Sequence, residues 1–206
     1  MGRGTEPRQP AAPVSGRQVA RRIRILRAAS ELAARDGLAG IQMQDVAKEA
    51  SVALGTLYRY FPSKPYLFAA VFEWHIETIL EGHGADTVVD ATADRAAEVA
   101  DTLIALSVKL LDSPLLASAT ALSAFSEYAA VTPTRFEIVE SCLGQTLLRV
   151  LGVDEVREQD RSVVRLLIYS WWGLFVAMLT EELTARQAES DLRLAARLIL
   201  APYDQG

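Results

Sequence analysis

The sequence lacks most of the residues on which metal binding, disulfide formation and covalent catalysis depend. It has one cysteine, Cys142, and two histidines, His75 and His83. A single cysteine excludes an internal disulfide and agrees with a reducing compartment. No GxxxxGK[ST] or GxGxxG phosphate loop occurs, and no serine lies between nucleophile-elbow glycines. We therefore expect a protein that is not an enzyme and that carries no cofactor and no metal.

The two histidines leave one metal hypothesis open. They lie eight residues apart, His75 before and His83 within the segment Gly82-His83-Gly84 that is expected to end a helix. Three glutamates lie nearby: Glu73, Glu77 and Glu81. The histidines do not form an HExxH motif, because no histidine follows another at the required spacing. Solvated positions on a helix face are the alternative that the pattern favours.

Long apolar runs and targeting signals are also missing. No window of 18 residues is both apolar and free of charge, so we expect no transmembrane helix. The start, MGRGTEPRQPAAPVSG, has no apolar segment of a secretory signal, and Glu6 occupies the place where myristoylation needs Ser or Thr. The expected compartment is the cytoplasm.

The net charge of −5 is unevenly distributed. Residues 1–64 hold 11 Lys and Arg against 5 Asp and Glu, whereas residues 65–206 hold 10 against 21. A basic head on an acidic body indicates an anionic partner at one end. A basic tail that binds nothing would give the same distribution, so charge alone leaves both interpretations open.

The apolar residues follow helical spacing. They recur at steps of three and four, and no useful stretch alternates with period two, so we expect an all-α fold of about nine helices. Asp36-Gly37 is expected to end the first helix in a left-handed cap. Residues 1–16, rich in Pro, Gly and Ser, are expected to form a disordered basic arm. The expected helices cover 16–36, 43–50, 54–60, 64–81, 90–111, 114–130, 133–151, 158–184 and 187–201.

Residues 43–60 have the pattern of a helix-turn-helix, two short helices joined by Ser51-Val52-Ala53. The second helix would enter a DNA major groove about 12 Å wide, with Leu57 and Phe61 as buried anchors. Polar side chains on its other faces suit phosphates and base edges, and the free N–H groups of the next helix start suit a phosphate. The candidate DNA-binding residues are Gln44, Gly55, Thr56, Tyr58, Arg59, Tyr60 and Lys64; Arg17, Arg21, Arg22 and Arg24 would add affinity by counterion release. An ordinary amphipathic helix packed into a core is the alternative.

The run IQMQDVAKEASVALGTLYRYFPSKPYLF, residues 41–68, resembles the DNA-binding domain of the TetR family of bacterial regulators. The resemblance covers about residues 18–68, and GTLYRYFPSK is its most specific part. It implies a three-helix DNA-binding head over residues 17–64, a divergent helical ligand-binding and dimerisation domain over 65–206, and a homodimer. It also places Thr56, Tyr58, Tyr60 and Lys64 at DNA.

Three positions depart from this family pattern. The family often has Thr, Gly and Ser where this chain has Gln42, Ser51 and Ala53. Because loss of a good helix cap costs about 1 kcal/mol, we expect weaker capping around the turn and an unchanged fold.

Two C-terminal segments, SPLLASATALSAF and WWGLFVAMLTEELTARQAESDLRLAARLIL, are similar to actinobacterial repressors of sterol catabolism. This resemblance implies a steroid acyl-CoA thioester as effector. An acyl-CoA needs cations for its phosphates, and the available ones, Lys109, Arg135 and Arg149, are few.

Residues 163–179 are apolar nearly all round, and such a helix must be covered on every side. We expect one face to line a cavity and the other to pack against a twin subunit, with the last helix completing a four-helix interface. The candidate dimer contacts are Trp172, Gly173, Val176, Leu194 and Leu198. The alternative is the central core helix of a monomer.

The other C-terminal helices would wall a pocket for a hydrophobic ligand, although most of their apolar residues are expected to be plain core. The candidate ligand residues are Leu106, Leu110, Leu122, Phe125, Tyr128, Cys142, Leu143, Leu147, Trp171, Phe175 and Met178. The expected function is a DNA-binding transcription regulator, a repressor released from a palindromic double-stranded operator by a small hydrophobic effector of steroid or acyl-CoA type. The alternative is a helical protein-interaction module, whose binding would not fall steeply with salt as DNA binding does.

Overall fold

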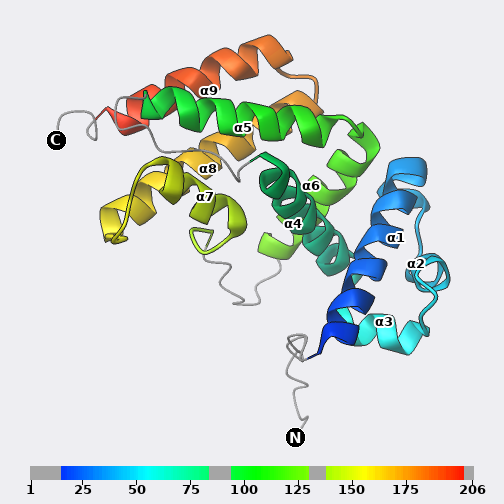
Figure 1. Ribbon diagram of the computed structural model, residues 1–206. Helices are drawn as coiled ribbons and strands as arrows, with labels where there is room; N and C mark the ends of the chain where they lie inside the picture. Colours follow the sequence, from blue (N-terminus) through cyan, green and yellow to red (C-terminus); the bar gives the residue numbers. More distant parts are fainter. Residues whose placement is uncertain (1–14, 84–93, 130–137, 202–206) are drawn as a thin grey trace, which may run out of the picture. The chain divides into compact units, whose positions relative to one another are not determined.

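A computed structural model of the protein describes residues 15–83, 94–129 and 138–201 (Figure 1). These ranges contain helices and turns and no strand, which confirms the predicted all-α class. The helices of this described part are α1 (Gly16–Gly40), α2 (Met43–Glu49), α3 (Leu54–Tyr60), α4 (Lys64–His83), α5 (Arg95–Leu111), α6 (Pro114–Ala129), α7 (Cys142–Val150), α8 (Glu158–Leu179) and α9 (Ala185–Leu200).

Helix ends differ from the prediction more than helix centres do. α5 begins at Arg95, and α7 begins only after Ser141, whose hydroxyl accepts a hydrogen bond from the Gly144 N–H at 3.1 Å. α8 ends at Leu179 because Glu181, with φ of 59°, turns the chain out of the helix. Apolar spacing, from which the bounds were predicted, does not reveal such caps.

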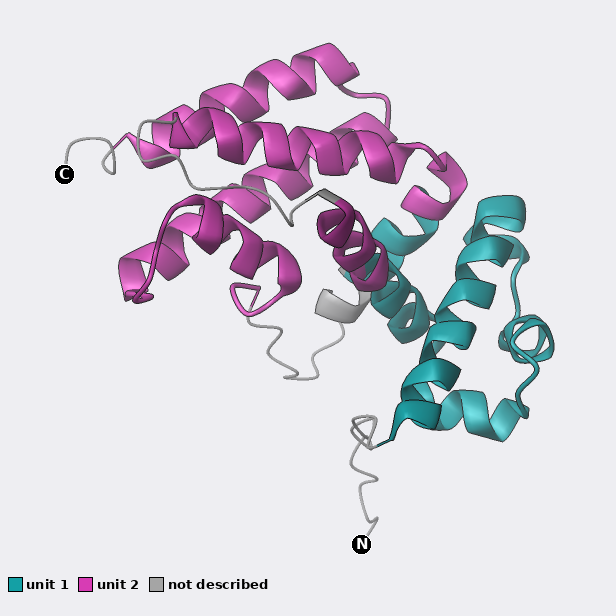
Figure 2. Ribbon diagram, viewed as in Figure 1, with its two compact units in different colours: residues 1–72, 118–131 teal, residues 73–117, 132–206 magenta. Residues whose placement is uncertain are grey.

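The chain divides into two compact units (Figure 2). Unit 1 comprises residues 1–72 and 118–131, and unit 2 comprises residues 73–117 and 132–206. The borders fall inside α4 and α6, so each of these helices contributes residues to both units.

Unit 1 is built around the inner face of α1. α1 packs against α2, and α2 packs against α3. Gly37 has φ of 65°, so the regular part of α1 ends at the predicted break. The side chains that fill this core are fully or almost fully buried: Ile25, Leu26, Ala29, Leu32, Val46, Leu57, Phe61 and Leu67.

In unit 2, α9 packs against α5 and α8, and α7 packs against α5 and α8. Trp171 is the largest fully buried side chain and stacks on Phe175, with ring centroids 5.6 Å apart. Its indole N–H donates to Ser107 Oγ at 2.8 Å, and this hydroxyl donates to the Leu103 carbonyl at 2.9 Å. The α5–α8 contact therefore buries apolar surface while its polar atoms remain hydrogen-bonded.

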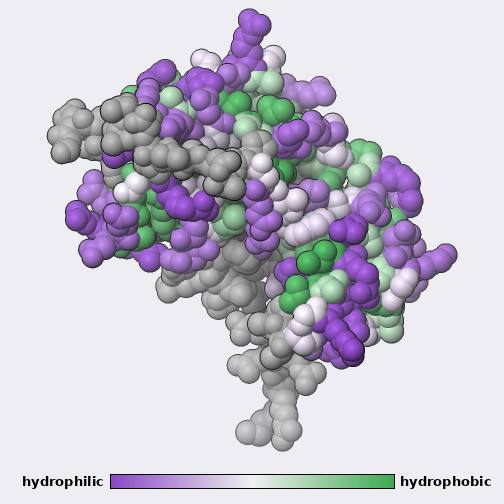
Figure 3. Space-filling model, viewed as in Figure 1, coloured by the Kyte–Doolittle hydropathy of each residue, from purple (hydrophilic) through white to green (hydrophobic). Residues whose placement is uncertain are grey.

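α8 is long and apolar enough to cross a membrane by length and composition alone. The sequence prediction required 18 apolar residues without a charge, and α8 did not meet this requirement because Arg165 interrupts its apolar run. Core helices of soluble proteins meet the same length and composition test. One side of α8 is buried inside unit 2 and the other is exposed, where Leu166, Tyr169 and Gly173 lie. On the face shown in Figure 3 the described surface is mostly hydrophilic, with smaller hydrophobic areas.

Candidate functional site

The turn between α2 and α3 has the geometry of a helix-turn-helix. Ser51 has φ of 52°. Its N–H donates to the Lys48 carbonyl at 3.1 Å, and the Val52 N–H donates to the Ala47 carbonyl at 2.9 Å. This left-handed ending explains why glycine is common here in the family that the sequence resembles, because glycine adopts positive φ without steric cost.

Capping differs between the two helices of the motif. Ala53 before α3 makes no side-chain cap hydrogen bond, whereas Gln42 and Asp45 form a capping box at the start of α2. In this box the Asp45 carboxylate accepts a hydrogen bond from the Gln42 N–H at 2.9 Å. The start of α2 is thus held from within the helix.

α3 has a buried face and an outward face. Leu57 and Phe61 are fully buried, as expected for anchors. The other predicted contacts on α3 are exposed or half-buried: Gly55, Thr56, Tyr58, Arg59 and Tyr60. A Cβ atom added at Gly55 would meet, within 4 Å, none of the described atoms outside the adjacent backbone of its own helix. The outward face of α3 is therefore free to approach a partner closely.

An open pocket of about 460 Å³ lies among α2, α3 and the start of α4. Three of its lining residues, Gln44, Tyr58 and Lys64, are predicted DNA contacts. Amide, phenol and ammonium groups are hydrogen-bond donors to phosphate oxygens. The fold brings these three side chains to one place, although they lie up to 20 residues apart in the sequence.

Lys64 is engaged differently from the prediction. Its ammonium donates to the backbone carbonyls of Leu38 at 2.5 Å and Ile41 at 2.6 Å. The start of α4 is capped by the Ser63 hydroxyl, which accepts from the Tyr66 N–H at 3.1 Å. Because an ammonium has three N–H groups, one stays available for an anion. Lys64 thus joins the end of α1 to the start of α4 and also faces the pocket.

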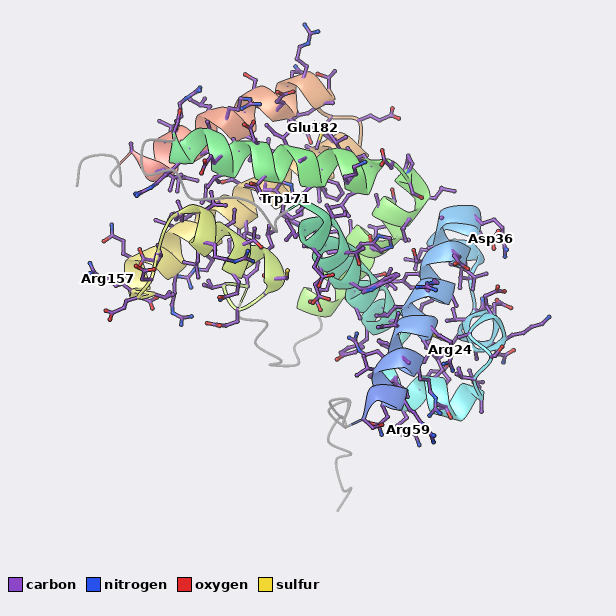
Figure 4. The ribbon with its side chains drawn as sticks, in the orientation of Figure 1. Arg24, Asp36, Arg59, Arg157, Trp171 and Glu182 are labelled. Carbon is purple, nitrogen blue, oxygen red and sulfur yellow. The ribbon has the colours of Figure 1, made fainter. Side chains whose placement is uncertain are left out.

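One side of the N-terminal half of α1 carries arginines, of which Arg17 and Arg24 are exposed and Arg21 is half-buried. Arg17, Arg21 and Arg24 follow at steps of four and three residues, which places them along one side of the helix. Neither these arginines nor Arg59 forms an ion pair with another described residue. Figure 4 shows Arg59 near the first turns of α1 and Asp36 toward the other end of that helix. Positive charge therefore collects beside α3 without internal neutralisation.

Two family models match the chain. Residues 25–71 match the bacterial regulatory proteins of the TetR family, and residues 90–199 match the tetracyclin repressor-like C-terminal domain. The chain belongs to the TetR family. It is 31% identical over 193 residues to the HTH-type transcriptional repressor KstR of Mycolicibacterium smegmatis, across 90% of this chain and 89% of that protein. The KstR of Mycobacterium tuberculosis is 30% identical, across 89% of this chain and 82% of that protein.

Solved structures agree with this assignment. A TetR transcriptional regulator from Rhodococcus sp. RHA1 matches with a TM-score of 0.78 and 36% identity, over 91% of this chain and 98% of that one. BioQ in complex with its double-stranded DNA operator matches with a TM-score of 0.56 and 26% identity, over 87% and 98% of the two chains. Since TetR proteins are DNA-binding regulators, this chain is a DNA-binding regulator and not an enzyme.

Most of the predicted ligand residues form the core of unit 2. Six of them are at most 7% exposed: Leu106, Leu110, Leu143, Leu147, Trp171 and Phe175. Met178 and Cys142 are half-buried. Leu122 belongs to unit 1 and is 62% exposed. The side chains of Phe125 and Tyr128 lie outside the described residues.

The thiol of Cys142 is not activated. Burial raises its pKa, and the nearby carboxylate of Glu77 raises the pKa further. The thiol is therefore protonated at neutral pH and is a weak nucleophile. Burial also lowers the pKa of His75, and the described residues contain no group of three or more possible metal ligands.

The predicted dimer contacts lie on two helices that pack against each other, α8 and α9. Gly173, Leu194 and Leu198 are exposed, and Leu198 reaches 68%, while Trp172 and Val176 are half-buried. The inner side of α9 is filled by residues such as Leu192, which is 3% exposed. The outer side of this helix pair thus carries large apolar residues that unit 2 does not cover.

Proposed function

We propose that the protein is a ligand-responsive transcriptional repressor of the cytoplasm. Residues 17–64 form its DNA-binding domain, and residues 65–206 bind the effector and a second subunit. The homodimer binds a palindromic operator and leaves it when a small hydrophobic effector binds.

The observation that carries this proposal is the outward face of α3. Gly55, Tyr58 and Arg59 are exposed over the buried anchors Leu57 and Phe61, and unpaired arginines of α1 belong to the same unit. An exposed polar helix face beside uncompensated positive charge fits a major groove and its flanking phosphates. The similarity to BioQ, whose structure includes its DNA operator, supports this use of the head.

Phosphate binding has a defined place in this proposal. The pocket lined by Gln44, Tyr58 and Lys64 offers side-chain donors from three helices or their ends. An operator phosphate seated there would fix the register of α3 along the groove. Thr56 and Tyr60, half-buried at the edges of α3, would add contacts to the backbone or to base edges.

A second copy of the chain would cover the exposed apolar side of α8 and α9. Each copy would contribute Trp172, Gly173, Val176, Leu194 and Leu198 to an interface around a two-fold axis. Gly173 favours close approach because it is exposed and has no side chain to hold a second helix away. Two heads held in this way would read half-sites about 34–36 Å apart.

The effector would act on the apolar core of unit 2. The side chains proposed to contact it, including Leu106, Trp171 and Phe175, are packed together in this structure. A ligand that enters must displace some of them and so favours a different arrangement of α5, α7 and α8. The resulting shift is limited to the difference in ligand affinity between the two arrangements. The similarity to KstR repressors, together with the C-terminal resemblance, favours a steroid or acyl-CoA class of effector.

The test is binding of the full-length protein to DNA from its own upstream region, measured by gel shift at about 50 and 200 mM salt. Tyr58→Ala and Lys64→Ala are compared with Glu49→Ala, an exposed change at the end of α2. We expect specific, salt-sensitive binding by the wild type and by Glu49→Ala, and weaker binding by the other two. Absence of any preferred sequence in a genome-wide fragment selection would contradict the proposal and favour a protein-interaction module. The same assay then screens steroids and acyl-CoA thioesters for operator release.

A further inference from the structure

α1 carries two arginines of equal charge in different surroundings. Arg22 is half-buried, and its guanidinium carbon lies 5.5 Å from the centroid of the Phe61 ring. Arg24 is exposed and makes no ion pair with another described residue. The two residues are separated by one position, so they point to different sides of the same helix.

The inward position of Arg22 follows from helical spacing. It precedes Leu26 by four residues and Ala29 by seven, and both of these side chains are fully buried. Residues at this spacing share one face of a helix. Arg22 thus extends the buried stripe of α1, and the sequence reading that grouped it with the surface arginines missed this.

Phe61 determines where the recognition helix ends. It is the C-cap of α3, it is fully buried, and its N–H donates to the Leu57 carbonyl at 2.9 Å. Its ring lies 6.3 Å from the ring of Tyr60 and 6.3 Å from the ring of Tyr66, centroid to centroid. The guanidinium of Arg22 on this ring is therefore a direct link from α1 to the end of α3. A cation over an aromatic ring is stabilised by the charge distribution of the ring, more strongly when partly withdrawn from water.

We infer that Arg22 is a positioning residue: it acts on DNA through Phe61, by fixing the orientation of α3, and governs discrimination between operator and other DNA. Arg24, by contrast, neutralises phosphate and contributes equally to all sequences. This inference rests on the proposed DNA-binding function of the head.

The two roles give different thermodynamic signatures. Phosphate neutralisation sets the slope of the logarithm of the binding constant against the logarithm of salt concentration, and a phosphate contact made on both kinds of DNA contributes to both slopes. Base recognition depends on the placement of a few side chains in the groove, and it sets the ratio of the affinity for operator DNA to the affinity for non-specific DNA. Loss of a phosphate contact changes the slope, whereas misplacement of α3 changes the ratio.

The experiment compares Arg22→Met with Arg24→Met in the full-length protein. Affinities are measured for an operator duplex selected by the wild type and for a scrambled duplex of equal length and composition, across several salt concentrations. Because each dimer carries two copies of Arg24, for Arg24→Met we expect the slope to fall by about 1.8 on both duplexes, with an unchanged affinity ratio. For Arg22→Met we expect the ratio to fall about three- to tenfold with an unchanged slope.

A second pair of variants guards against simple unfolding. Arg22→Lys keeps a cation but loses the planar group that stacks on a ring, so its ratio should fall less than that of Arg22→Met. Glu155→Gln, an exposed change in unit 2, should change neither quantity. Partial unfolding would lower both affinities in proportion and leave their ratio unchanged, which distinguishes it from misplacement of α3.

The inference is overturned if the Arg22 variants lower the slope and keep the ratio, because Arg22 would then be a phosphate contact like Arg24. It is also overturned if neither Arg22 variant changes the ratio. If the wild type itself shows no preferred duplex, the proposed function fails first, and this result differs from the other two.

Discussion

In unit 1, Arg17, Arg24 and Arg59 are exposed and form no ion pair with another described residue, although Arg35 near the end of α1 pairs with Asp36. In unit 2 several arginines are joined to carboxylates. Arg161 lies 2.9 Å from Glu140, and Arg193 lies 2.8 Å from Asp101. Both units thus expose arginine, but only in unit 2 is much of its charge satisfied within the protein. Arginine is therefore available to bind an external anion in unit 1, whereas in unit 2 it stabilises the fold.

Apolar surface shows the reverse distribution. In unit 1, α2 packs against α3, the anchors Leu57 and Phe61 are fully buried, and the exposed large apolar residues of α1 and α3 are Val19, Ile23 and Tyr58. In unit 2 the outer side of α8 and α9 exposes Leu166, Tyr169, Leu194 and Leu198. The exposed charge of unit 1 fits a DNA partner, and the exposed apolar surface of unit 2 fits a second subunit.

The largest effect should come from disrupting the exposed apolar side of α8 and α9. Leu198→Glu places a charge at the most exposed leucine of α9, and we expect a monomer whose operator affinity falls at least about a hundredfold, because two linked heads no longer bind together. Sedimentation equilibrium and gel shift measure the two effects. Leu115→Glu, at a leucine that is 51% exposed elsewhere in unit 2, should remain a dimer. A dimeric Leu198→Glu variant would show that α9 is not the interface.

The core of unit 2 should be the next most sensitive. Trp171→Ala removes the largest buried side chain, and we expect the free energy of unfolding to fall by about 3–5 kcal/mol. Trp171→Phe keeps most of the volume but loses the N–H bonded to Ser107, which should cost about 1 kcal/mol. Urea denaturation at one fixed protein concentration tests both. Equal losses for the two variants would mean that the hydrogen bond, and not packing, holds α5 to α8.

A smaller effect is expected at one turn in each unit. Ser51 and Glu181 both have positive φ, 52° and 59°, so Ser51→Gly and Glu181→Gly should each raise the free energy of unfolding by about 0.5–1 kcal/mol. Ser190→Gly, at an exposed position inside α9, should instead lower it by about 0.5 kcal/mol. Thermal denaturation of the three variants provides the comparison. A destabilised Ser51→Gly variant would mean that the serine side chain contributes more than its backbone strain costs.

The smallest effect concerns pH. Burial lowers the pKa of His75 below its ordinary value of 6.5. The unfolded chain therefore binds a proton more readily than the folded chain, so stability is full above pH 6.5 and declines as the pH falls toward the folded-state pKa. Urea titrations from neutral pH down to the onset of carboxylate protonation should show this decline in the wild type and not in His75→Gln. A decline of the same size in both would assign it to other groups.

The centres of the helices and the helix-turn-helix were predictable because apolar spacing and turn residues are local signals. The starts of α5 at Arg95 and of α7 at Cys142 were predicted too early, because helical apolar spacing in the sequence extends to residues before the N-caps Asp94 and Ser141. The roles of Lys64 and Arg22 were not predictable from charge, because each depends on a partner distant in the chain: the Leu38 carbonyl in one case, the Phe61 ring in the other.

The pocket-lining prediction shows the same limit. Spacing identified the apolar side chains of α5, α7 and α8, but a buried leucine and a ligand-contacting leucine have the same pattern. The exposure of Leu122, which spacing placed with them, depends on the tertiary packing of α6.

Two matched double variants test the central claim most directly. The claim is that the exposed arginines of unit 1 bind DNA, whereas those of unit 2 stabilise the fold. Arg24→Gln with Arg59→Gln removes two unpaired charges from unit 1, and Arg161→Gln with Arg165→Gln removes two paired charges from unit 2. The measurement is the salt dependence of operator binding. Because the dimer loses four such charges, we expect the slope to fall by about 3.6 for the unit 1 variant and to stay at the wild-type value for the unit 2 variant. Equal slopes for the two variants would contradict the account.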